Sequence, residues 1–186
     1  MLITAVEPRR KAMCALYIDG EYVMNLDART VIENRFDVGR EIDDEELHEI
    51  IRLSNERRAK EKALWLISYR DHSKKELTDK IKRTCDEESA EKAVERMEEL
   101  GLVDDENFAR RYAEQLLFSK HNAPRGAVRQ LVQKGIDREL AEEIIDRKYK
   151  NINDEKIRRR AVAALQRLGY GWDDIKTVLR EYTEED

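Results

Sequence analysis

Basic side chains gather on predicted helices in the C-terminal half of the chain, and their chemistry is that of binding anions. Lys156, Arg160 and Arg167 lie at i, i+4 and i+11, which places them on one helix face beside an apolar stripe. Cations on such a face contact nucleic-acid phosphates or the carboxylates of an acidic protein surface. A solvated face with apolar stems is the alternative interpretation for any single residue. The candidates for partner contact are Arg110, Arg111, Arg125, Arg129, Lys156, Arg158, Arg159, Arg160 and Arg167.

No set of side chains in the sequence has the spacing of a catalytic or metal-binding site. The histidines His48, His72 and His121 are far apart in the sequence, and each is predicted near a helix surface or a turn. Metalloprotease, serine-hydrolase, phosphate-loop and dinucleotide-binding motifs are absent from it. The pairs Asp43-Asp44 and Asp104-Asp105 are interpreted as helix caps, because a metal ion would need more converging oxygen ligands. We therefore expect no enzyme activity, no catalytic residue, no metal and no cofactor.

Four aromatic side chains near predicted helix boundaries have either a packing role or a contact role. Tyr69, Phe118 and Trp172 are expected to pack in the core, because large rings bury much apolar area. Trp65 lies toward one edge of its apolar stripe. It is a candidate for partner contact if it is exposed.

Composition favours a helical protein without membrane segments. Charged residues make up 41% of the chain, which has only 7 glycines and 2 prolines. Residues 1–53 hold 7 Lys/Arg and 12 Asp/Glu, whereas the remainder holds 29 of each. That balance does not favour a dedicated duplex-DNA binder, which usually has a basic excess. No apolar run has the length of a membrane span or a signal peptide, so a cytoplasmic protein without membrane contact is expected.

The first 27 residues are predicted to form a small β-structure. Residues 2–6 form an apolar run, and residues 12–18 and 21–26 flank Asp19-Gly20. An Asp-Gly pair between two such runs indicates a two-residue hairpin turn, because both turn positions favour positive φ.

Helical periodicity begins at Asp43, where Glu46 three residues later completes a capping-box pattern. Ser54-Asn55 either breaks this first helix or only bends it. Further helix starts are predicted at Ser73, Asp86, Asp105, Pro124 and Asp137.

The helical part of the chain repeats itself. The segment that begins at Ala127 matches the segment that begins at Ala161, so that Gly135 aligns with Gly169. Repeats of this length indicate stacked helical units, and the third copy is short by its first helix. We predict a mainly α protein with tandem three-helix repeats in an elongated, curved array, preceded by a small β-hairpin-containing N-terminal domain. The expected divisions are 1–53 (N-terminal domain with a linking helix), 54–103 (repeat 1), 104–150 (repeat 2) and 151–186 (shortened repeat 3).

Several segments carry family-like motifs. Residues 63–77 read ALWLISYRDHSKKEL, residues 100–109 read LGLVDDENFA, and residues 134–136 read KGI. In order and spacing these motifs resemble those of the RecX family over nearly the whole chain. The Asp19-Gly20 hairpin is similar to the β-rich extension of family members from Gram-positive bacteria.

The resemblance implies a regulator of the RecA recombinase. RecX proteins bind RecA filaments on single-stranded DNA and inhibit recombinase, ATPase and co-protease activities, and some contact DNA weakly. The resemblance thus implies a role in DNA repair, recombination and the SOS response, and we expect the chain to act as a monomer. The alternative is a helix-turn-helix-like nucleic-acid-binding module that acts independently of RecA, because three-helix units and basic stripes suit that function as well.

Overall fold

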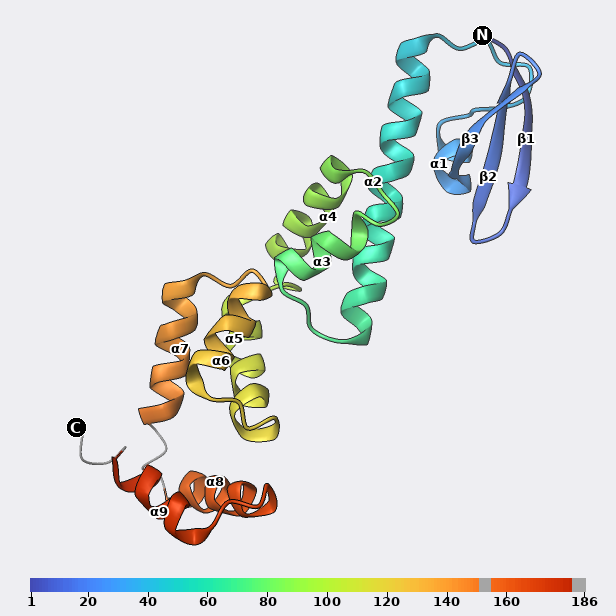
Figure 1. The fold of residues 1–186 in the computed structure, drawn as a ribbon. Coiled ribbons are helices and arrows are strands. Elements are labelled where there is room, and N and C mark those ends of the chain that lie inside the picture. The colour runs from blue at the N-terminus through green and yellow to red at the C-terminus, as the bar shows by residue number, and fades with distance from the viewer. Residues whose placement is uncertain (151–154, 182–186) are drawn as a thin grey trace. The chain divides into compact units, whose positions relative to one another are not determined.

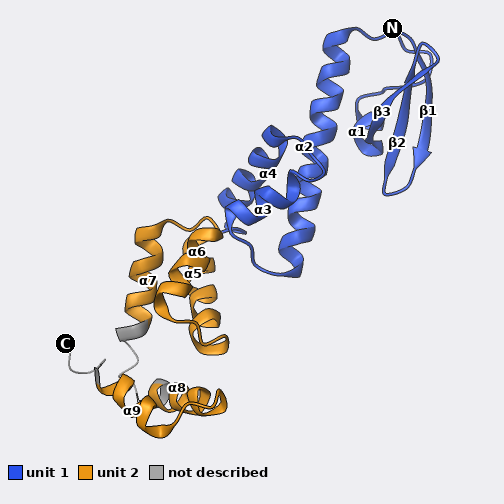
Figure 2. Cartoon of the chain, in the orientation of Figure 1, with its two compact units in different colours: residues 1–103 blue, residues 104–186 orange. Residues whose placement is uncertain are grey.

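The structure, a computed structural model, describes residues 1–150 and 155–181 (Figure 1), and side chains are described for residues 1–148 and 158–180. The described part is mainly helical, with a three-stranded antiparallel sheet before the helices. This confirms the predicted mainly α fold with a small N-terminal β-structure. The chain divides into two compact units, residues 1–103 and 104–186 (Figure 2).

The sheet is a meander of β1 (Ile3–Arg9), β2 (Met13–Ile18) and β3 (Glu21–Asp27). Asp19 and Gly20 have φ angles of 51° and 87°, which confirms the predicted hairpin turn. Strand β1 is longer than predicted and runs through Pro8. Proline fits there because β1 is an edge strand, where a residue without an N–H is tolerated.

One face of the sheet packs against α1 (Ala28–Glu33) and the first half of α2 (Asp44–Tyr69). Alternation along each strand puts every second side chain on this face. The core formed there consists of Ile3, Cys14, Leu16, Ile18, Leu26, Val31, Phe36, Ile42 and Ile50.

Helix α2 begins with the predicted capping box and continues without a break through Ser54. The Asp43 side chain accepts a hydrogen bond from the Glu46 N–H at 2.8 Å, and Glu46 accepts one from the Asp43 N–H at 3.3 Å. Ser54 is 0% exposed, and its Oγ accepts a hydrogen bond from the backbone N–H of Asp27 at 2.8 Å. The Ser54 hydroxyl thus forms a hydrogen bond with the end of β3 and does not interrupt the hydrogen bonds of α2. The division expected between residues 53 and 54 lies inside α2.

Helices α3 (Lys74–Ile81) and α4 (Glu87–Glu99) pack on the second half of α2. Their predicted caps are confirmed, because Ser73 accepts a hydrogen bond from the Glu76 N–H and Asp86 accepts one from Ser89. The buried core consists of Ala59, Ala63, Leu66, Leu77, Ile81, Ala90, Ala93, Val94, Met97 and Val103.

The second unit begins with α5 (Asp105–Glu114), which continues as a π-helical turn, η1 (Gln115–Ser119). The predicted helix start at Asp105 is confirmed. The cap is Asp104, whose Oδ1 accepts a hydrogen bond from the Asn107 N–H at 3.0 Å. Asp105 lies in the first turn, where its negative charge interacts favourably with the positive end of the helix dipole.

Helices α6 (Pro124–Gln133) and α7 (Arg138–Lys150) complete a three-helix packing with α5. Pro124 occupies the first turn of α6 as predicted. The core of this unit consists of Phe108, Ala109, Ala113, Leu116, Leu117, Ala127, Leu131, Ile136, Ala141, Ile144 and Ile145.

Helices α8 (Glu155–Arg167) and α9 (Trp172–Glu181) form the last helical pair. Gly135 after α6 and Gly169 after α8 have φ angles of 88° and 87°. Glycine adopts this left-handed conformation without strain, so the two aligned positions end their helices in the same way. Residues 151–154, where the third repeat was expected to begin, lie outside the described residues.

Candidate functional site

The nine basic residues predicted to contact a partner lie on three helices of the second unit. Helix α5 carries the first two, α6 the next two, and α8 the other five. The side chain of Lys156 lies outside the described residues, so the prediction that it shares a helix face with Arg160 and Arg167 is not tested. The exposed members of the set are Arg110, Arg111, Arg125, Arg129, Arg158, Arg159, Arg160 and Arg167.

The two arginines on α6 are the best placed for an intermolecular contact. Arg125 and Arg129 are one turn apart, on the face opposite Ala127 and Leu131, which are buried. No residue in the described part of the chain forms an ion pair with either arginine. Their charges are therefore available to an acidic partner.

Two other arginines are already engaged by their own helices. Arg110 forms an ion pair with Glu106, one turn earlier on α5. Arg167 donates a hydrogen bond from Nε to the carbonyl oxygen of Ala163 at 3.2 Å. A partner that bound these side chains would have to compete with those contacts, so their contribution to binding would be smaller.

The structure corrects the expectation for two of the aromatic residues. Tyr69 and Trp172 are predicted in the core, but both are exposed. Tyr69 is the last residue of α2 and Trp172 the first residue of α9, so each lies at a helix end outside the packed turns. Phe118 is partly buried against the core of the second unit, as expected. Trp65 is 54% exposed, so it is a candidate for partner contact.

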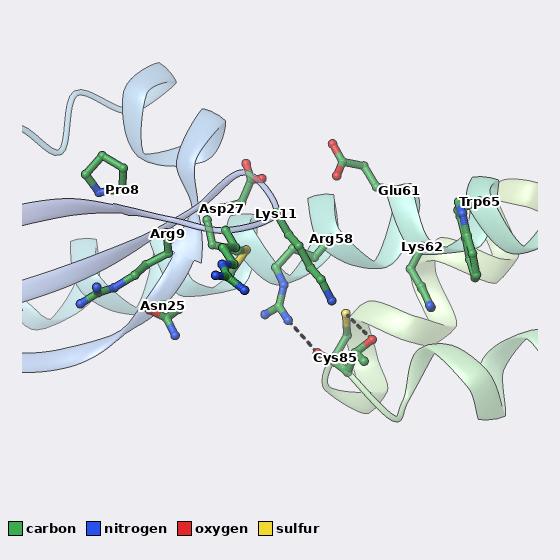
Figure 3. A pocket seen from close by; sticks show the side chains of 13 residues that line it. Pro8, Arg9, Lys11, Asn25, Asp27, Arg58, Glu61, Lys62, Trp65 and Cys85 are labelled. Atoms are coloured by element: carbon green, nitrogen blue, oxygen red, sulfur yellow. Dashed lines mark hydrogen bonds between the residues drawn. The ribbon is translucent and has the colours of Figure 1, made fainter.

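Sequence reasoning missed a basic hollow in the first unit. It lies between the β1–β2 connection and one face of α2, and its volume is about 1500 Å³ (Figure 3). Five basic side chains and two carboxylates line it, together with Trp65. The basic residues are Arg9 at the end of β1, Arg10 and Lys11 on the connection, and Arg58 and Lys62 on α2.

Two signals in the sequence belong to this hollow, although neither predicts it alone. Residues 9–11 are three consecutive cations in an otherwise acidic segment. Arg58, Lys62, Trp65 and Tyr69 follow one another at i, i+4, i+7 and i+11, which is one face of a helix. Only the folded chain places the run beside that helix face.

The described residues offer little for nucleophilic or metal chemistry. Both cysteines are free thiols, and burial raises the pKa of the Cys14 thiol, with the Asp27 carboxylate adding to the effect. A raised pKa leaves less thiolate, the reactive form. Across the described part of the chain, no three His, Cys, Asp or Glu side chains are grouped so that they could hold a metal ion. The exposed cations are chemically suited to binding.

Comparison with known proteins identifies the helical part of the chain. It matches the first three-helix domain of RecX over residues 59–97, the second over 104–145 and the third over 136–179. The chain belongs to the RecX family. The tandem three-helix organisation predicted from the repeats is thereby confirmed. The matches to the second and third RecX domains overlap at residues 136–145, so the first part of α7 belongs to both matches.

RecX proteins from several bacteria align with most of the chain. The regulatory protein RecX of Caldanaerobacter subterraneus subsp. tengcongensis is 29% identical over 164 residues, covering 87% of this chain and 83% of its own. The regulatory protein RecX of Clostridium tetani is 28% identical and covers 97% and 93%. That of Clostridium beijerinckii is 30% identical and covers 81% and 68%. Relatives of this chain are therefore named as regulators.

A solved structure agrees on the fold. The crystal structure of a regulatory protein RecX superposes with a TM-score of 0.53 at 19% identity, covering 97% of this chain and 98% of that one. At this identity the likeness concerns the RecX fold alone. No helix within the described residues has both the length and the apolar character needed to cross a membrane.

Proposed function

We propose that this RecX-family chain binds the RecA filament on single-stranded DNA and inhibits its recombinase, ATPase and co-protease activities. The observation that carries the proposal is the match of three RecX domains in their order along residues 59–179. Relatives that share these domains are named regulatory proteins. The link to RecA comes from what the family resemblance implies.

Inhibition by binding needs no catalytic residue. A regulator shifts an equilibrium only by its difference in affinity for two states of its target. Arg125 and Arg129 support such a role, because they are exposed, lie one turn apart and have no carboxylate partner among the described residues. In this proposal they contact an acidic surface or phosphates in the filament.

The test is a titration of the full chain into RecA filaments on single-stranded DNA, read as the rate of ATP hydrolysis. We expect the rate to fall as the protein is added. Removing both charges in Arg125→Gln/Arg129→Gln should raise the concentration for half inhibition about thirtyfold, since two charge-assisted contacts at about 1 kcal/mol each sum to about 2 kcal/mol. A rate that does not change at any ratio of the two proteins would contradict the proposal.

A matched control removes the same charge from the same unit. Arg138 and Arg147 on α7 are exposed but pair with Glu142 and Glu143 at 2.8 and 2.7 Å. Arg138→Gln/Arg147→Gln should therefore leave the inhibition curve nearly unchanged. The charge reversal Lys156→Glu/Arg160→Glu/Arg167→Glu, run in parallel, asks whether α8 contributes to the same contact.

The second candidate function is a helix-turn-helix-like module that binds nucleic acid without RecA. Arg125 and Arg129, which form no ion pair with a described residue, favour it, since phosphates attract such cations. It predicts affinity for a DNA duplex in the absence of RecA, falling steeply as salt rises. Duplex binding with no effect on ATP hydrolysis would favour this candidate over filament regulation.

A further inference from the structure

The basic hollow of the first unit concentrates positive charge in the most acidic part of the chain. Three of the seven Lys/Arg residues within residues 1–53 are the consecutive Arg9, Arg10 and Lys11. The fold brings them to the same hollow as Arg58 and Lys62 of α2. In Figure 3 the α2 residues follow one another along the helix, with the connection beside them.

The two carboxylates of the hollow do not cancel this charge. Asp27 is buried, and its charge is offset by Arg57, whose Nε lies 3.6 Å from the Asp27 Oδ1. Figure 3 shows Glu61 leaving α2 in a different direction from Lys62. The hollow therefore keeps a net positive charge.

Four of the five cations are also unpaired by carboxylates. No described residue forms an ion pair with Arg10, Lys11 or Lys62. Arg58 donates a hydrogen bond to the carbonyl oxygen of Thr84 at 3.0 Å, and this neutral acceptor leaves its charge in place. Within the described residues, Arg9 is the one cation of the five that has a carboxylate partner, Glu7 at 2.9 Å.

An exposed pair of rings continues the same helix face. Trp65 lines the hollow, and Tyr69 one turn later is 79% exposed, with 5.5 Å between the two ring centroids. The Nζ of Lys62 lies 4.3 Å from the centroid of Trp65. From Arg58 to Tyr69 this face extends about 16 Å along α2. Cations and then rings thus follow each other along one surface.

We propose that this hollow binds a single strand of nucleic acid, with phosphates against Lys11, Arg58 and Lys62 and a base stacked on Trp65. Proteins that bind single strands combine a positively charged groove with exposed rings. An acidic protein surface would use the cations but would leave the rings unused. A duplex keeps its base faces stacked inside the helix. The proposal rests on the first unit alone and does not depend on an action on RecA.

The test uses fluorescence of Trp65 in the full chain. The sequence has two tryptophans, so Trp172→Phe leaves Trp65 as the only one. Titration with a short oligothymidylate, without RecA, should quench this fluorescence, because a stacked base quenches the indole. In an anisotropy titration with the labelled oligonucleotide, Trp65→Ala should weaken binding by at least about fivefold, whereas Trp65→Phe keeps a ring and should weaken it less.

The phosphate contacts are tested by salt dependence. Lys11→Gln/Lys62→Gln should make the slope of log affinity against log salt shallower by about 1.4, since each phosphate contact on a single strand contributes about 0.7. The control is Lys60→Gln/Lys75→Gln, which removes the same charge from exposed sites of the same unit outside the hollow. Its slope should match that of the unaltered chain.

Three results would overturn the assignment. They are the absence of Trp65 quenching, an unchanged salt slope in Lys11→Gln/Lys62→Gln, and equal binding of polyglutamate with no loss in Trp65→Ala. The last result would assign the hollow to an acidic protein surface. RecA-dependent ATP hydrolysis is measured with the same variants, so loss of single-strand binding with intact inhibition separates this proposal from the proposed function.

Discussion

His72 is a buried imidazole whose two ring nitrogens have different partners. Its Nδ1 lies 2.8 Å from the carbonyl oxygen of Arg70, and its Nε2 lies 2.8 Å from Lys80 Nζ. Because a carbonyl can only accept, Nδ1 carries the hydrogen and Nε2 accepts one from the lysine. Burial lowers the pKa of His72 below its ordinary value, and the positive charges of Arg70 and Lys80 add to the lowering, whereas the hydrogen bond to the Arg70 carbonyl oxygen opposes it. The neutral ring is the form that fits the fold.

This residue should make stability depend on pH in a defined window. Above pH ~6.5 the ring is neutral in both the folded and the unfolded chain, and it contributes no pH dependence. As pH falls below that value, the unfolded chain binds a proton that the folded chain resists, so the free energy of unfolding falls by at most about 1.4 kcal/mol per pH unit. Urea unfolding of the chain and of His72→Gln at a series of pH values measures the difference. The same slope in both proteins would contradict the assignment.

At the scale of elements, a buried polar contact joins β3, α1 and α2. Asp27 ends β3 and caps α1 by accepting hydrogen bonds from the N–H and the hydroxyl of Thr30. The backbone N–H of Asp27 donates to Ser54 Oγ in the middle of α2. All three residues are buried, so water cannot replace these partners. These hydrogen bonds therefore fix the position of the sheet relative to α2.

Ser54→Ala should lower the free energy of unfolding by about 1–3 kcal/mol, because it leaves the buried N–H of Asp27 without an acceptor. Ser68→Ala is the matched control on the same helix. Ser68 is exposed, and its hydroxyl bonds only the carbonyl oxygen of Trp65 in the preceding turn. The control should change stability by no more than about 0.5 kcal/mol. Equal effects of the two substitutions in urea unfolding would show that the contact across elements contributes nothing.

At the scale of the whole molecule, the chain has two compact units with separate cores. The cores around the sheet and around α2–α4 belong to residues 1–103, and the core of α5–α7 belongs to residues 104–186. A core that is complete within one unit gives that unit its own cooperative unfolding. A substitution in one core should therefore leave the other unit largely unaffected.

Leu131→Ala tests this independence. Leu131 is fully buried in the second unit, and its truncation should cost that unit about 2–5 kcal/mol. Amide hydrogen exchange should accelerate in α5–α7 and stay unchanged in α2–α4. The control is Val132→Ala, the neighbouring position, whose side chain is exposed. Faster exchange in both units would mean that the chain unfolds as one cooperative body.

Features that depend on neighbouring residues can be predicted from the sequence. Asp19-Gly20 predicts its turn, and Asp43 with Glu46 predicts the capping box, because the atoms that interact are at most three residues apart. The repeat match between Gly135 and Gly169 likewise predicts helix ends of one kind, and motif order predicts the family. An elongated, curved array, a monomer, a cytoplasmic location and the four divisions of the chain stay predictions.

Which distant residues share a surface or a core depends on how the whole chain folds. The sequence allows a helix break at Ser54, whereas in the fold the Ser54 hydroxyl accepts a hydrogen bond from Asp27, 27 residues away. Lys11 and Lys62 are 51 positions apart in the sequence and line one hollow in the fold. Periodicity reports which side of a helix a residue occupies. It carries no information on what packs there, because that depends on the burial of apolar surface contributed by the whole unit.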